Sequence, residues 1–327
     1  MQGIPGSGDS IGVSTVDIVI VNWNSGERLR ECLARLRDQV AADVRIGRVV
    51  VVDNASSDGS ADGLAMPDAA LEVRRNAVNV GFARACNEGA RGSVADFILF
   101  LNPDAAPEPG ALAVAARHFA DPVHVRTGIV GIQLTGEDGT VARACARFPS
   151  AWGIMGASVA LDRVAPRWCA PHFMAEWDHL EDRAVDQVIG AFFLVRRALF
   201  EQLGGFDERF FLYYEEVDFS RRAASAGWRS WYCAHARTFH EGGGSSSAIP
   251  ARRLFLVLRS RLQYARKHFS RLETALVYAV TLVVEPFSRS VLALHRRGLR
   301  GVGETMAGYA MLWRDLPIGP SAERPAR

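Results

Sequence analysis

The sequence predicts an α/β fold with a mostly parallel β-sheet, helices on both of its faces, and a helical C-terminal extension. Two patterns in the first hundred residues predict the sheet. Short apolar or β-branched segments alternate with amphipathic ones, and each apolar segment ends at a polar or glycine-rich turn. Alternating strands and helices favour parallel pairing. The chain has 327 residues, 49% of them hydrophobic, which is enough to bury a large core.

The first half of the chain carries the alternating pattern. We expect strands at residues 16–21, 49–52, 71–73 and 97–101, because these segments are apolar and rich in β-branched side chains. A helix is expected at 81–90, and another directly after the first strand. That first helix has an apolar face formed by Leu29, Cys32, Leu33 and Leu36.

The second half is more mixed and contains no internal repeat. The expected elements are, in order, a strand at 129–134, a strand at 188–195, a helix at 197–203, a helix at 218–226, a strand at 229–234 and a Gly/Ser loop at 241–247. From Arg252 onward the pattern is helical and basic.

Charge is unevenly distributed along the chain. Residues 251–327 contain 14 Lys and Arg against 5 Asp and Glu, a net charge of +9, whereas the rest of the chain is at −7. Arg252, Arg259 and Arg266 recur every seven residues in a segment with apolar side chains at helical spacing, which is typical of a basic helix lying on anionic lipid. The alternative is an ordinary helix packed on the protein. Nucleic acid is the weakest candidate partner, because no known binding motif accompanies the charge.

Cysteine usage and apolar segments indicate the compartment. The five cysteines are scattered singly, as expected of buried thiols in a reducing compartment. The N-terminal segment is rich in Gly and Ser and does not look like a secretory signal. The apolar run at 275–284 is closed by Glu285 and Pro286, short of the roughly 20 residues of a spanning helix. We therefore expect a cytoplasmic protein that is not integral to the membrane.

Polar side chains directly follow three of the expected strands. They are Asn22 and Asn24, then Asp53, Asn54, Ser56 and Asp58, then Asn102 and Asp104. Asn, Asp and Ser also form turns, and for 54–59 alone a turn is the preferred interpretation. Ligands of open α/β sheets bind beyond the carboxyl ends of the strands. Three polar clusters at one such edge therefore predict a single polar crevice.

Asp104 and His240 are candidate metal ligands. A carboxylate just past a strand suits Mg²⁺ or Mn²⁺, which commonly take one or two protein carboxylates plus substrate phosphates. A helix-capping turn would explain Asp104 equally well by itself. His240 follows a strand and precedes the Gly/Ser loop, so it is a candidate second ligand that favours Mn²⁺.

The segment 206–219 places five carboxylates among six aromatic side chains. Apolar surroundings raise the pKa of a carboxyl group, which suits a general base near neutral pH. Aromatic rings also pack well on sugars. The alternative is that Glu215, Glu216 and Asp218 only interact with a helix N-terminus. Three adjacent acids exceed that need, so one of them is a candidate base.

The ordered set of these motifs resembles the family 2 glycosyltransferases, most closely the bacterial rhamnosyltransferase-like branch. The matching segments are 19–24 (VIVNWN), 52–60 (VDNASSDGS), 79–83 (NVGFA) with Asn87, 101–104 (LNPD), 204–208 (GGFDE), 214–218 (YEEVD) and 240–243 (HEGG). Each segment alone is weak evidence, and the specificity comes from their order over residues 16–247.

The resemblance implies a GT-A fold and a domain plan. A catalytic domain at 15–250, with a donor half at 15–135 and an acceptor half at 136–250, would follow a flexible leader at 1–14. Residues 251–327 would form the basic amphipathic helical extension.

The resemblance also implies residue roles. The donor set for a dTDP- or UDP-sugar comprises Asn22, Asn24, Asp53, Ser56, Asp58, Asn79, Gly81 and Asn102. Asp104 occupies the last acid position of the family's D-x-D motif, and His240 completes a site for Mg²⁺ or Mn²⁺. The base position falls on Glu216, with Glu215 as the alternative. The residues assigned to the acceptor are Asp207, Tyr213 and Tyr214.

Two positions depart from the family pattern. Asn102 replaces the first acid of D-x-D, so the diphosphate would have to supply more of the metal ligands. Glu216 replaces the usual Asp and carries its carboxylate about one methylene further from the backbone.

The implied activity is inverting transfer of rhamnose or another hexose to a hydroxyl of a glycan or polyprenyl-linked acceptor in cell-envelope polysaccharide synthesis. The expected location is the inner face of the plasma membrane. A non-catalytic nucleotide-sugar-binding module is the main alternative. A sugar nucleotidyltransferase would need a basic Gly-rich loop after the first strand, and a processive synthase would need Q-x-x-R-W and spanning helices; neither pattern is found.

Overall fold

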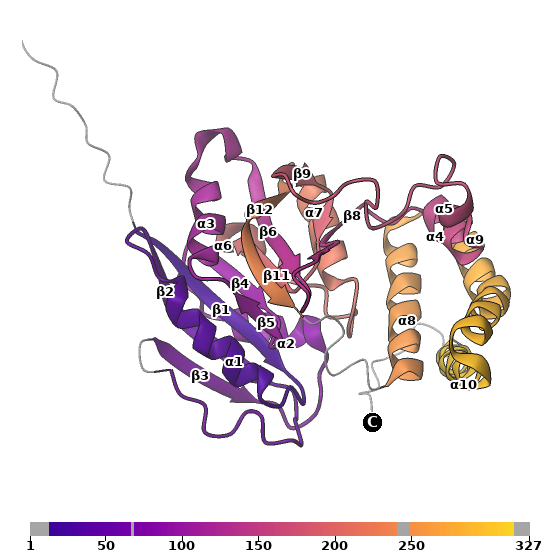
Figure 1. The fold of residues 1–327 in the computed structure, drawn as a ribbon, viewed down its shortest axis with the longest axis horizontal. Helices are drawn as coiled ribbons and strands as arrows, with labels where there is room; N and C mark the ends of the chain where they lie inside the picture. Colours follow the sequence, from indigo (N-terminus) through magenta and orange to yellow (C-terminus); the bar gives the residue numbers. More distant parts are fainter. Residues whose placement is uncertain (1–12, 67–68, 241–248, 317–327) are drawn as a thin grey trace, which may run out of the picture.

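The computed structural model describes residues 13–66, 69–240 and 249–316. A central β-sheet carries helices on both faces, and a group of C-terminal helices stands beside it (Figure 1). The expected α/β architecture is therefore confirmed. Most of the expected leader and the whole Gly/Ser loop after His240 lie outside the described residues.

The elements divide into three consecutive groups. The first contains β1 (Ser14–Asn22), α1 (Arg28–Arg35), η1 (Leu36–Gln39), β2 (Val44–Asp53), β3 (Ala70–Arg75), α2 (Phe82–Ala90), β4 (Phe97–Leu101), β5 (Ala105–Pro107), α3 (Ala111–Arg117), η2 (His118–Ala120), η3 (Pro122–His124) and β6 (Thr127–Thr135). The second contains β7 (Val141–Ala142), β8 (Cys145–Ala146), α4 (Ala151–Ser158), α5 (Leu161–Val164), β9 (Arg183–Val185), β10 (Gln187–Val188), β11 (Phe192–Arg196), α6 (Arg197–Gln202), α7 (Glu215–Ser225) and β12 (Arg229–His240). The third contains α8 (Pro250–His268), α9 (Arg271–Ala279), the π-helix η5 (Val280–Val284) and α10 (Glu285–Asp315).

The main sheet has the strand order β3-β2-β1-β4-β11-β6-β12-β5. The first four strands are parallel, β11 runs antiparallel to both β4 and β6, and β12 is parallel to β6. The short β5 pairs antiparallel with the end of β12. The carboxyl ends of β1, β2, β4, β6 and β12 therefore lie at one edge of the sheet.

Both faces of the sheet are buried. Along β1, Ile18 and Ile20 face a core that includes Leu29 of α1, while Val19 faces a second core that includes Phe219 of α7. Successive side chains of a strand point to opposite faces. A strand buried on both sides therefore needs the uninterrupted apolar run that predicted it.

Several expected elements have different boundaries in the structure; the strand expected at 49–52, for example, begins at Val44. The strand expected at 188–195 is two strands in different sheets: β10 pairs with β8, and β11 lies in the main sheet. Between them, the backbone N–H of Ile189 donates to the carbonyl of Ala144. Helix α7 begins at Glu215 rather than Asp218, after a left-handed turn at Tyr213 and Tyr214. Strand β12 continues six residues beyond the expected end, to His240.

The apolar run at 275–284 was expected to be too short for a spanning helix, but the helical segment that contains it is much longer than the run. The π-helix η5 precedes Pro286 and α10 continues through it, since a local π turn tolerates the missing N–H. By length and composition, the helical segment Arg271–Asp315 could cross a membrane, although only 22% of its most apolar window is buried. The segment is not straight. At Gly298, with φ of +64°, it folds back, so that the indole N–H of Trp313 donates to the carbonyl of Leu282.

The sequence left open whether the apolar face of α8 lies on lipid or packs on the protein, and the structure buries that face in the protein. Leu258, Leu262 and Ala265 pack with Val277 of α9 and Tyr309 of α10. The apolar face of a helix is buried against any apolar surface within reach, and here α9 and α10 provide that surface. The alternative of a helix packed on the protein therefore applies to α8.

Close packing of α2 on the sheet can be tested at Gly89. A Cβ atom there would lie 2.4 Å from Val19 Cγ1 and 3.1 Å from Val52 Cγ2. We expect Gly89→Ala to lower the free energy of unfolding by about 1–3 kcal/mol through overpacking. The measurement is the midpoint of chemical denaturation.

Gly303 of α10 is the matched control, because nothing lies within 4 Å of its Cβ position. Gly303→Ala should leave stability unchanged or raise it by up to about 1 kcal/mol. Equal effects of the two substitutions would contradict the packing argument.

Candidate functional site

The polar clusters predicted from the sequence meet at the carboxyl edge of the sheet. Asn22 at the end of β1 is the register partner of Asp53 at the end of β2. Leu101, the last residue of β4, pairs with Phe192 at the start of β11. His240 at the end of β12 pairs with Ala105 of β5. The structure therefore gathers side chains from distant parts of the sequence along a single edge.

Asn22 is the centre of a buried polar network. Its side-chain amide donates to Asp53 Oδ1 at 2.8 Å, to Ser60 Oγ at 2.9 Å and to Ser56 Oγ at 3.1 Å. Asn22 is fully buried, and its Oδ1 atom has no partner within the described residues. An unpaired buried oxygen is costly, so this atom is suited to accept from a ligand donor such as an imide N–H.

Asn24 and Asp58 shape the loops around this network. Asn24 lies in the left-handed region with φ of +52°, and its Oδ1 accepts from the backbone N–H of Ser57 at 2.8 Å. Asp58 accepts from Ser60 and from the backbone N–H of Gly26. Burial alone would raise the pKa of Asp58, but these hydrogen bonds lower it below its ordinary value. Asp58 therefore acts as a loop-to-loop acceptor.

Asn79 and Gly81 lie next to the loop that precedes α7. Asn79 Oδ1 accepts from the backbone N–H of Gly81. Gly81 has φ of +91°, and a Cβ atom there would lie 2.6 Å from the carbonyl oxygen of Phe211. The backbone N–H of Phe82 donates to that same oxygen at 2.6 Å. Only glycine fits this position, since it must allow both a positive φ and a close backbone approach.

Asn102, Asp104 and His240 form the second cluster. His240 Nε2 lies 3.4 Å from Asp104 Oδ1 and 3.2 Å from Asn102 Nδ2. Asp104 is largely buried, which would raise its pKa, but its contacts with His240 lower it below its ordinary value. The carboxylate is therefore ionised at neutral pH and faces an imidazole nitrogen.

These residues fit a divalent cation that takes part of its ligands from a substrate. A carboxylate oxygen and an imidazole nitrogen converge on one point, and the adjacent amide of Asn102 adds a polar atom. Within the described ranges no group of three or more His, Cys, Asp or Glu side chains has an arrangement that could hold a metal ion. Mg²⁺ and Mn²⁺ commonly complete such sparse sites with phosphate oxygens.

Glu215 and Glu216 open helix α7. Glu215 is 5% exposed, and one carboxylate oxygen of each residue is buried without a hydrogen-bond partner in the described structure. Burial raises the pKa of both carboxyl groups, and the nearby Glu216 raises that of Glu215 further. A desolvated carboxylate with an unused oxygen is suited to accept a proton from a bound hydroxyl.

A short connector links this pair to the metal-site residues. Gly190 Cα faces Glu216, because a Cβ atom built on the glycine would lie 4.0 Å from Glu216 Cγ. The next residue, Ala191, accepts a hydrogen bond from the backbone N–H of Asn102 at 3.0 Å. Residues 189–191, which join β10 to β11, therefore contact the candidate base Glu216 on one side and Asn102, beside the candidate metal ligands, on the other.

The predicted acceptor residues have different surroundings. Asp207 forms ion pairs with Arg209 and Lys267, and these hold the pKa of its carboxyl well below the usual range. Tyr213 and Tyr214 both have left-handed backbones, with φ of +69° and +72°. Such conformations cost non-glycine residues roughly 1 kcal/mol or more each. The strained turn ends immediately before Glu215 and so sets where α7 begins.

Asp218, two residues beyond Glu216, is clamped by helix α8. Its fully buried carboxylate lies 2.6 Å from Lys267 Nζ and 2.7 Å from His268 Nε2, both on α8, and 2.8 Å from Arg222 Nε. Burial would raise the pKa of Asp218, but these partners lower it below its ordinary value. The sequence suggested only a helix cap here. A long-range pairing of this kind leaves no local signal.

Arg28 is a further residue that the sequence analysis missed. It opens α1 directly after the Asn22–Gly26 turn, and its charge contributes to lowering the pKa of Asp104. The only available signal was a basic residue in the first turn after a polar loop, which is common in helices of every kind.

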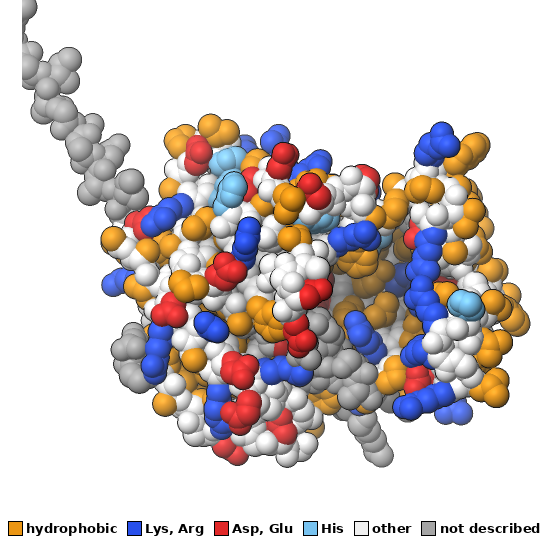
Figure 2. Space-filling view, viewed as in Figure 1, with side chains coloured by type: hydrophobic (Ala, Val, Ile, Leu, Met, Phe, Trp, Pro, Cys, Tyr) orange, Lys and Arg blue, Asp and Glu red, His pale blue; other side chains and the backbone are white. Residues whose placement is uncertain are grey.

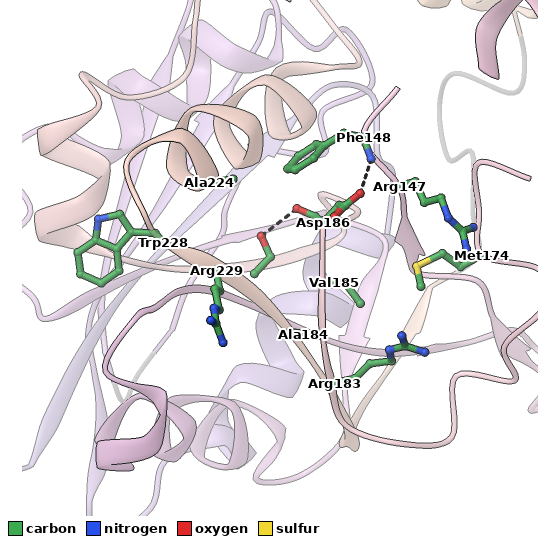
Figure 3. Close-up of a pocket in the computed structure, with 11 residues that line it drawn as sticks. Arg147, Phe148, Met174, Arg183, Ala184, Val185, Asp186, Ala224, Trp228 and Arg229 are labelled. Atoms are coloured by element: carbon green, nitrogen blue, oxygen red, sulfur yellow. Dashed lines mark hydrogen bonds between the residues drawn. The ribbon is translucent and has the colours of Figure 1, made fainter. Parts of the chain in front are cut away.

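A hollow of about 450 Å³ lies away from this edge (Figure 3). It is lined by Arg183 of β9, Ala224 near the end of α7 and Arg229 at the start of β12. Asp186 also lines the hollow, and its carboxylate accepts from the backbone N–H of Phe148 at 2.9 Å. Because Glu216 and His240 occupy the opposite ends of α7 and β12, this hollow is separate from the candidate site.

Comparisons with known proteins agree on one family. A family model described as glycosyl transferase family 2 matches residues 17–204. An N-acetylglucosaminyl-diphospho-decaprenol L-rhamnosyltransferase from Mycobacterium tuberculosis is 31% identical over 255 residues, covering 72% of this chain and 79% of the relative. The low-salt glycan biosynthesis hexosyltransferase Agl10 from Haloferax volcanii is 23% identical over 265 residues, covering 78% and 77%.

Solved structures share the fold. The mannosyltransferase PcManGT from Pyrobaculum calidifontis, in complex with GDP-Man and Mn²⁺, has a TM-score of 0.56 at 17% identity and covers 92% of this chain and 87% of its own. The structure of S. aureus TarS 1–349 in complex with UDP-GlcNAc has a TM-score of 0.51 at 16% identity, with coverages of 90% and 81%. At such identities the likeness concerns the fold alone.

The clamp on α7 can be tested by removing Lys267. We expect Lys267→Met to lower the free energy of unfolding by about 1–3 kcal/mol at neutral pH, since Asp218 and Asp207 both lose a charged donor. Both carboxyls have lowered pKa values, so their stabilising effect is present above the ordinary Asp pKa of about 3.9 and is lost as the pH falls through the folded-state values. The difference from wild type should therefore shrink toward acid pH in urea denaturation.

Arg209→Met provides the control, because Arg209 binds the same Asp207 from a largely exposed position. The substitution should lower the free energy of unfolding by less than about 1 kcal/mol. A pH-independent defect in Lys267→Met would point to lost packing and would argue against the clamp.

Proposed function

Since the chain belongs to glycosyl transferase family 2 and is a hexosyltransferase, we propose that it is an inverting, metal-assisted enzyme that moves rhamnose or another hexose from a dTDP- or UDP-sugar to an acceptor hydroxyl. The observation that carries the proposal is the half-buried side chain of Glu216, one carboxylate oxygen of which is buried and unpaired in the described structure, next to the residues 189–191 that bind Asn102. It supplies a base on the acceptor side of the candidate donor site.

The donor would lie along the carboxyl edge of the sheet. The unpaired Oδ1 of Asn22 and the adjacent Asp53 carboxylate are suited to a pyrimidine base and a ribose or deoxyribose. The diphosphate would then extend past β4 toward Asp104. A divalent cation held by Asp104 and His240, when bound, would stabilise the negative charge of the departing diphosphate.

The chemical step transfers one glycosyl group. The acceptor oxygen attacks the anomeric carbon from the face opposite the diphosphate, the carbon–oxygen bond to the diphosphate breaks, and the hydroxyl proton passes to Glu216. The products are an inverted glycoside and a nucleoside diphosphate. The raised pKa of Glu216 favours this proton transfer, because a more basic carboxylate holds the proton more firmly. Glu215 lies beside it and is the alternative base.

A polyprenyl-linked acceptor is the favoured class. The relative from M. tuberculosis is named for a decaprenol-linked substrate, and this chain carries an extended group of C-terminal helices next to α7. Asp207, Tyr213 and Tyr214 belong to the loop that precedes the candidate base. This loop is therefore the proposed acceptor surface. The proposed location is the inner face of the plasma membrane, with peripheral contact to the bilayer.

The base assignment is tested with Glu216→Gln. We expect kcat to fall by about 10²–10⁴-fold, since proton abstraction in the transition state is lost. Donor binding should be retained, and a thermal-shift titration with dTDP- and UDP-sugars in Mn²⁺ measures it. Glu215→Gln is the matched variant on the neighbouring residue. Full transfer by Glu216→Gln together with inactive Glu215→Gln would move the role to Glu215.

The metal assignment is tested with Asp104→Asn. The variant keeps the shape of the side chain but removes the charge facing His240, so the apparent Mn²⁺ affinity should weaken by at least tenfold, or roughly 1.4 kcal/mol. The measurement is the Mn²⁺ dependence of the donor-induced rise in Tm. Asp58→Asn, which alters a loop carboxylate of the nucleotide cluster, should leave the Mn²⁺ dependence unchanged. Equal behaviour of the two variants would place the metal elsewhere.

A further inference from the structure

Exposed apolar side chains are concentrated in one part of the molecule. Within the described residues, every exposed Leu, Met, Phe and Trp lies either between residues 152 and 180 or between 272 and 313. The exposed large apolar side chains of residues 13–125 are all valines. Monomeric soluble proteins rarely gather large apolar side chains on one surface without a partner.

The larger concentration follows one face of α9, η5 and the first part of α10. The exposed members recur at helical spacing and are Leu272, Leu276, Val283, Phe287, Val291 and Leu294. They span about 33 Å along the helix axis. Figure 2 shows hydrophobic side chains along the outer margin of these helices, on the side away from the sheet. We refer to these six residues as the outer stripe.

Two exposed tryptophans of the other concentration, residues 152–180, belong to α4 and the segment after it, and α4 packs against α9 and η5. Trp168 is 79% exposed, and its carbonyl accepts from the indole N–H of the half-exposed Trp152 at 2.8 Å. Helix α4, which carries Trp152, is tied to the start of α10 by the bond from Ser288 Oγ to the carbonyl of Ser158. Tryptophan is the side chain that most favours the boundary between lipid and water.

Arginines border this surface. Exposed ones include Arg163 and Arg167, close in sequence to Trp168, Arg271 at the start of α9, Arg296 at the hairpin tip and Arg314 near its end. Arg297 and Arg300 are also exposed, and both pair with Glu304. Leu299, at the same tip, is 82% exposed. Of the nearby acids, Glu273 closes a capping box with Ser270. Basic side chains around an apolar stripe match anionic headgroups above acyl chains.

The opposite face of the helix is fixed to the protein. Arg261 of α8 binds Thr281 and the fully buried Glu285, and Arg289 binds the same Glu285. If the segment crossed a bilayer, this ion-pair network and α8 would be carried into hydrocarbon, at a large cost. The segment is therefore suited to lie along the surface with only its outer stripe inserted.

We propose that the outer stripe, with Trp152 and Trp168 beside it, is the surface that seats the protein on an anionic phospholipid bilayer. The bilayer would then contact α9 and α10 and not α8. The inference rests on the proposed function only in that a lipid-linked acceptor requires such a surface. A second copy of the chain fits less well, because a two-fold contact through the same stripe would bring the same arginines together.

The experiment is co-sedimentation of the full chain with vesicles. Wild type should bind vesicles of phosphatidylglycerol and phosphatidylcholine, should bind pure phosphatidylcholine weakly, and should lose binding to the mixed vesicles as salt is raised. The double variant Phe287→Ser/Val291→Ser should reduce partitioning by at least about tenfold. Leu272→Ser/Leu276→Ser, at the other end of the stripe, should act in the same direction.

The matched control is Val94→Ser/Val123→Ser, which removes two strongly exposed valines outside the C-terminal helices. It should leave partitioning onto the vesicles unchanged. Failure of wild type to bind the mixed vesicles would overturn the inference. Equal loss in the control would overturn it too, as would a dimer in light scattering that Phe287→Ser/Val291→Ser converts to a monomer.

Transfer to a short-chain, water-soluble acceptor separates this inference from the proposed function. Phe287→Ser/Val291→Ser should retain that transfer while losing vesicle binding. Absence of transfer in wild type would refute the proposed function alone, and vesicle binding unaffected by the stripe variants would refute the membrane surface alone.

Discussion

The pairing of β12 with β5 is the contact on which the candidate site depends. It sets His240 opposite Ala105 and so brings the imidazole to within 3.4 Å of Asp104, across more than a hundred residues of chain. The same pairing closes the outer edge of the sheet, where unpaired backbone groups would otherwise be exposed. One set of backbone hydrogen bonds thus positions a candidate metal ligand and also pairs the end of β12.

The opposite side of the site is held by ionic contacts. Asp218 of α7 is bound by Lys267 and His268 of α8, and Ser260 of α8 donates to the carbonyl of Leu212 in the preceding loop. These contacts anchor the helix that opens with the two buried glutamates. The C-terminal helices therefore have two faces with different structural roles. One supports α7, and the other carries the exposed apolar stripe.

Strain and desolvation are concentrated at the start of α7. Tyr213 and Tyr214 adopt left-handed backbones, and the glutamates that follow keep unpaired buried oxygens. Each of these features destabilises the fold. The surrounding structure holds them by packing Phe210, Val217 and Tyr264 together. Local features that lower stability, such as these, are expected where the arrangement of residues is required for chemistry.

The sequence by itself determined the alternating α/β pattern, the strand at 97–101, and the polar ends at Asn22, Asp53 and Asp104, because these are written in local periodicity and turn chemistry. Only the tertiary structure decided which acids are buried, which face of the C-terminal helices is free, and where α7 begins. The sequence left open whether α8 lies on lipid or on protein, and the short apolar run at 275–284 did not show that the helix continues through Pro286. An amphipathic pattern does not say whether protein or bilayer covers it, and a π turn leaves no sequence signature.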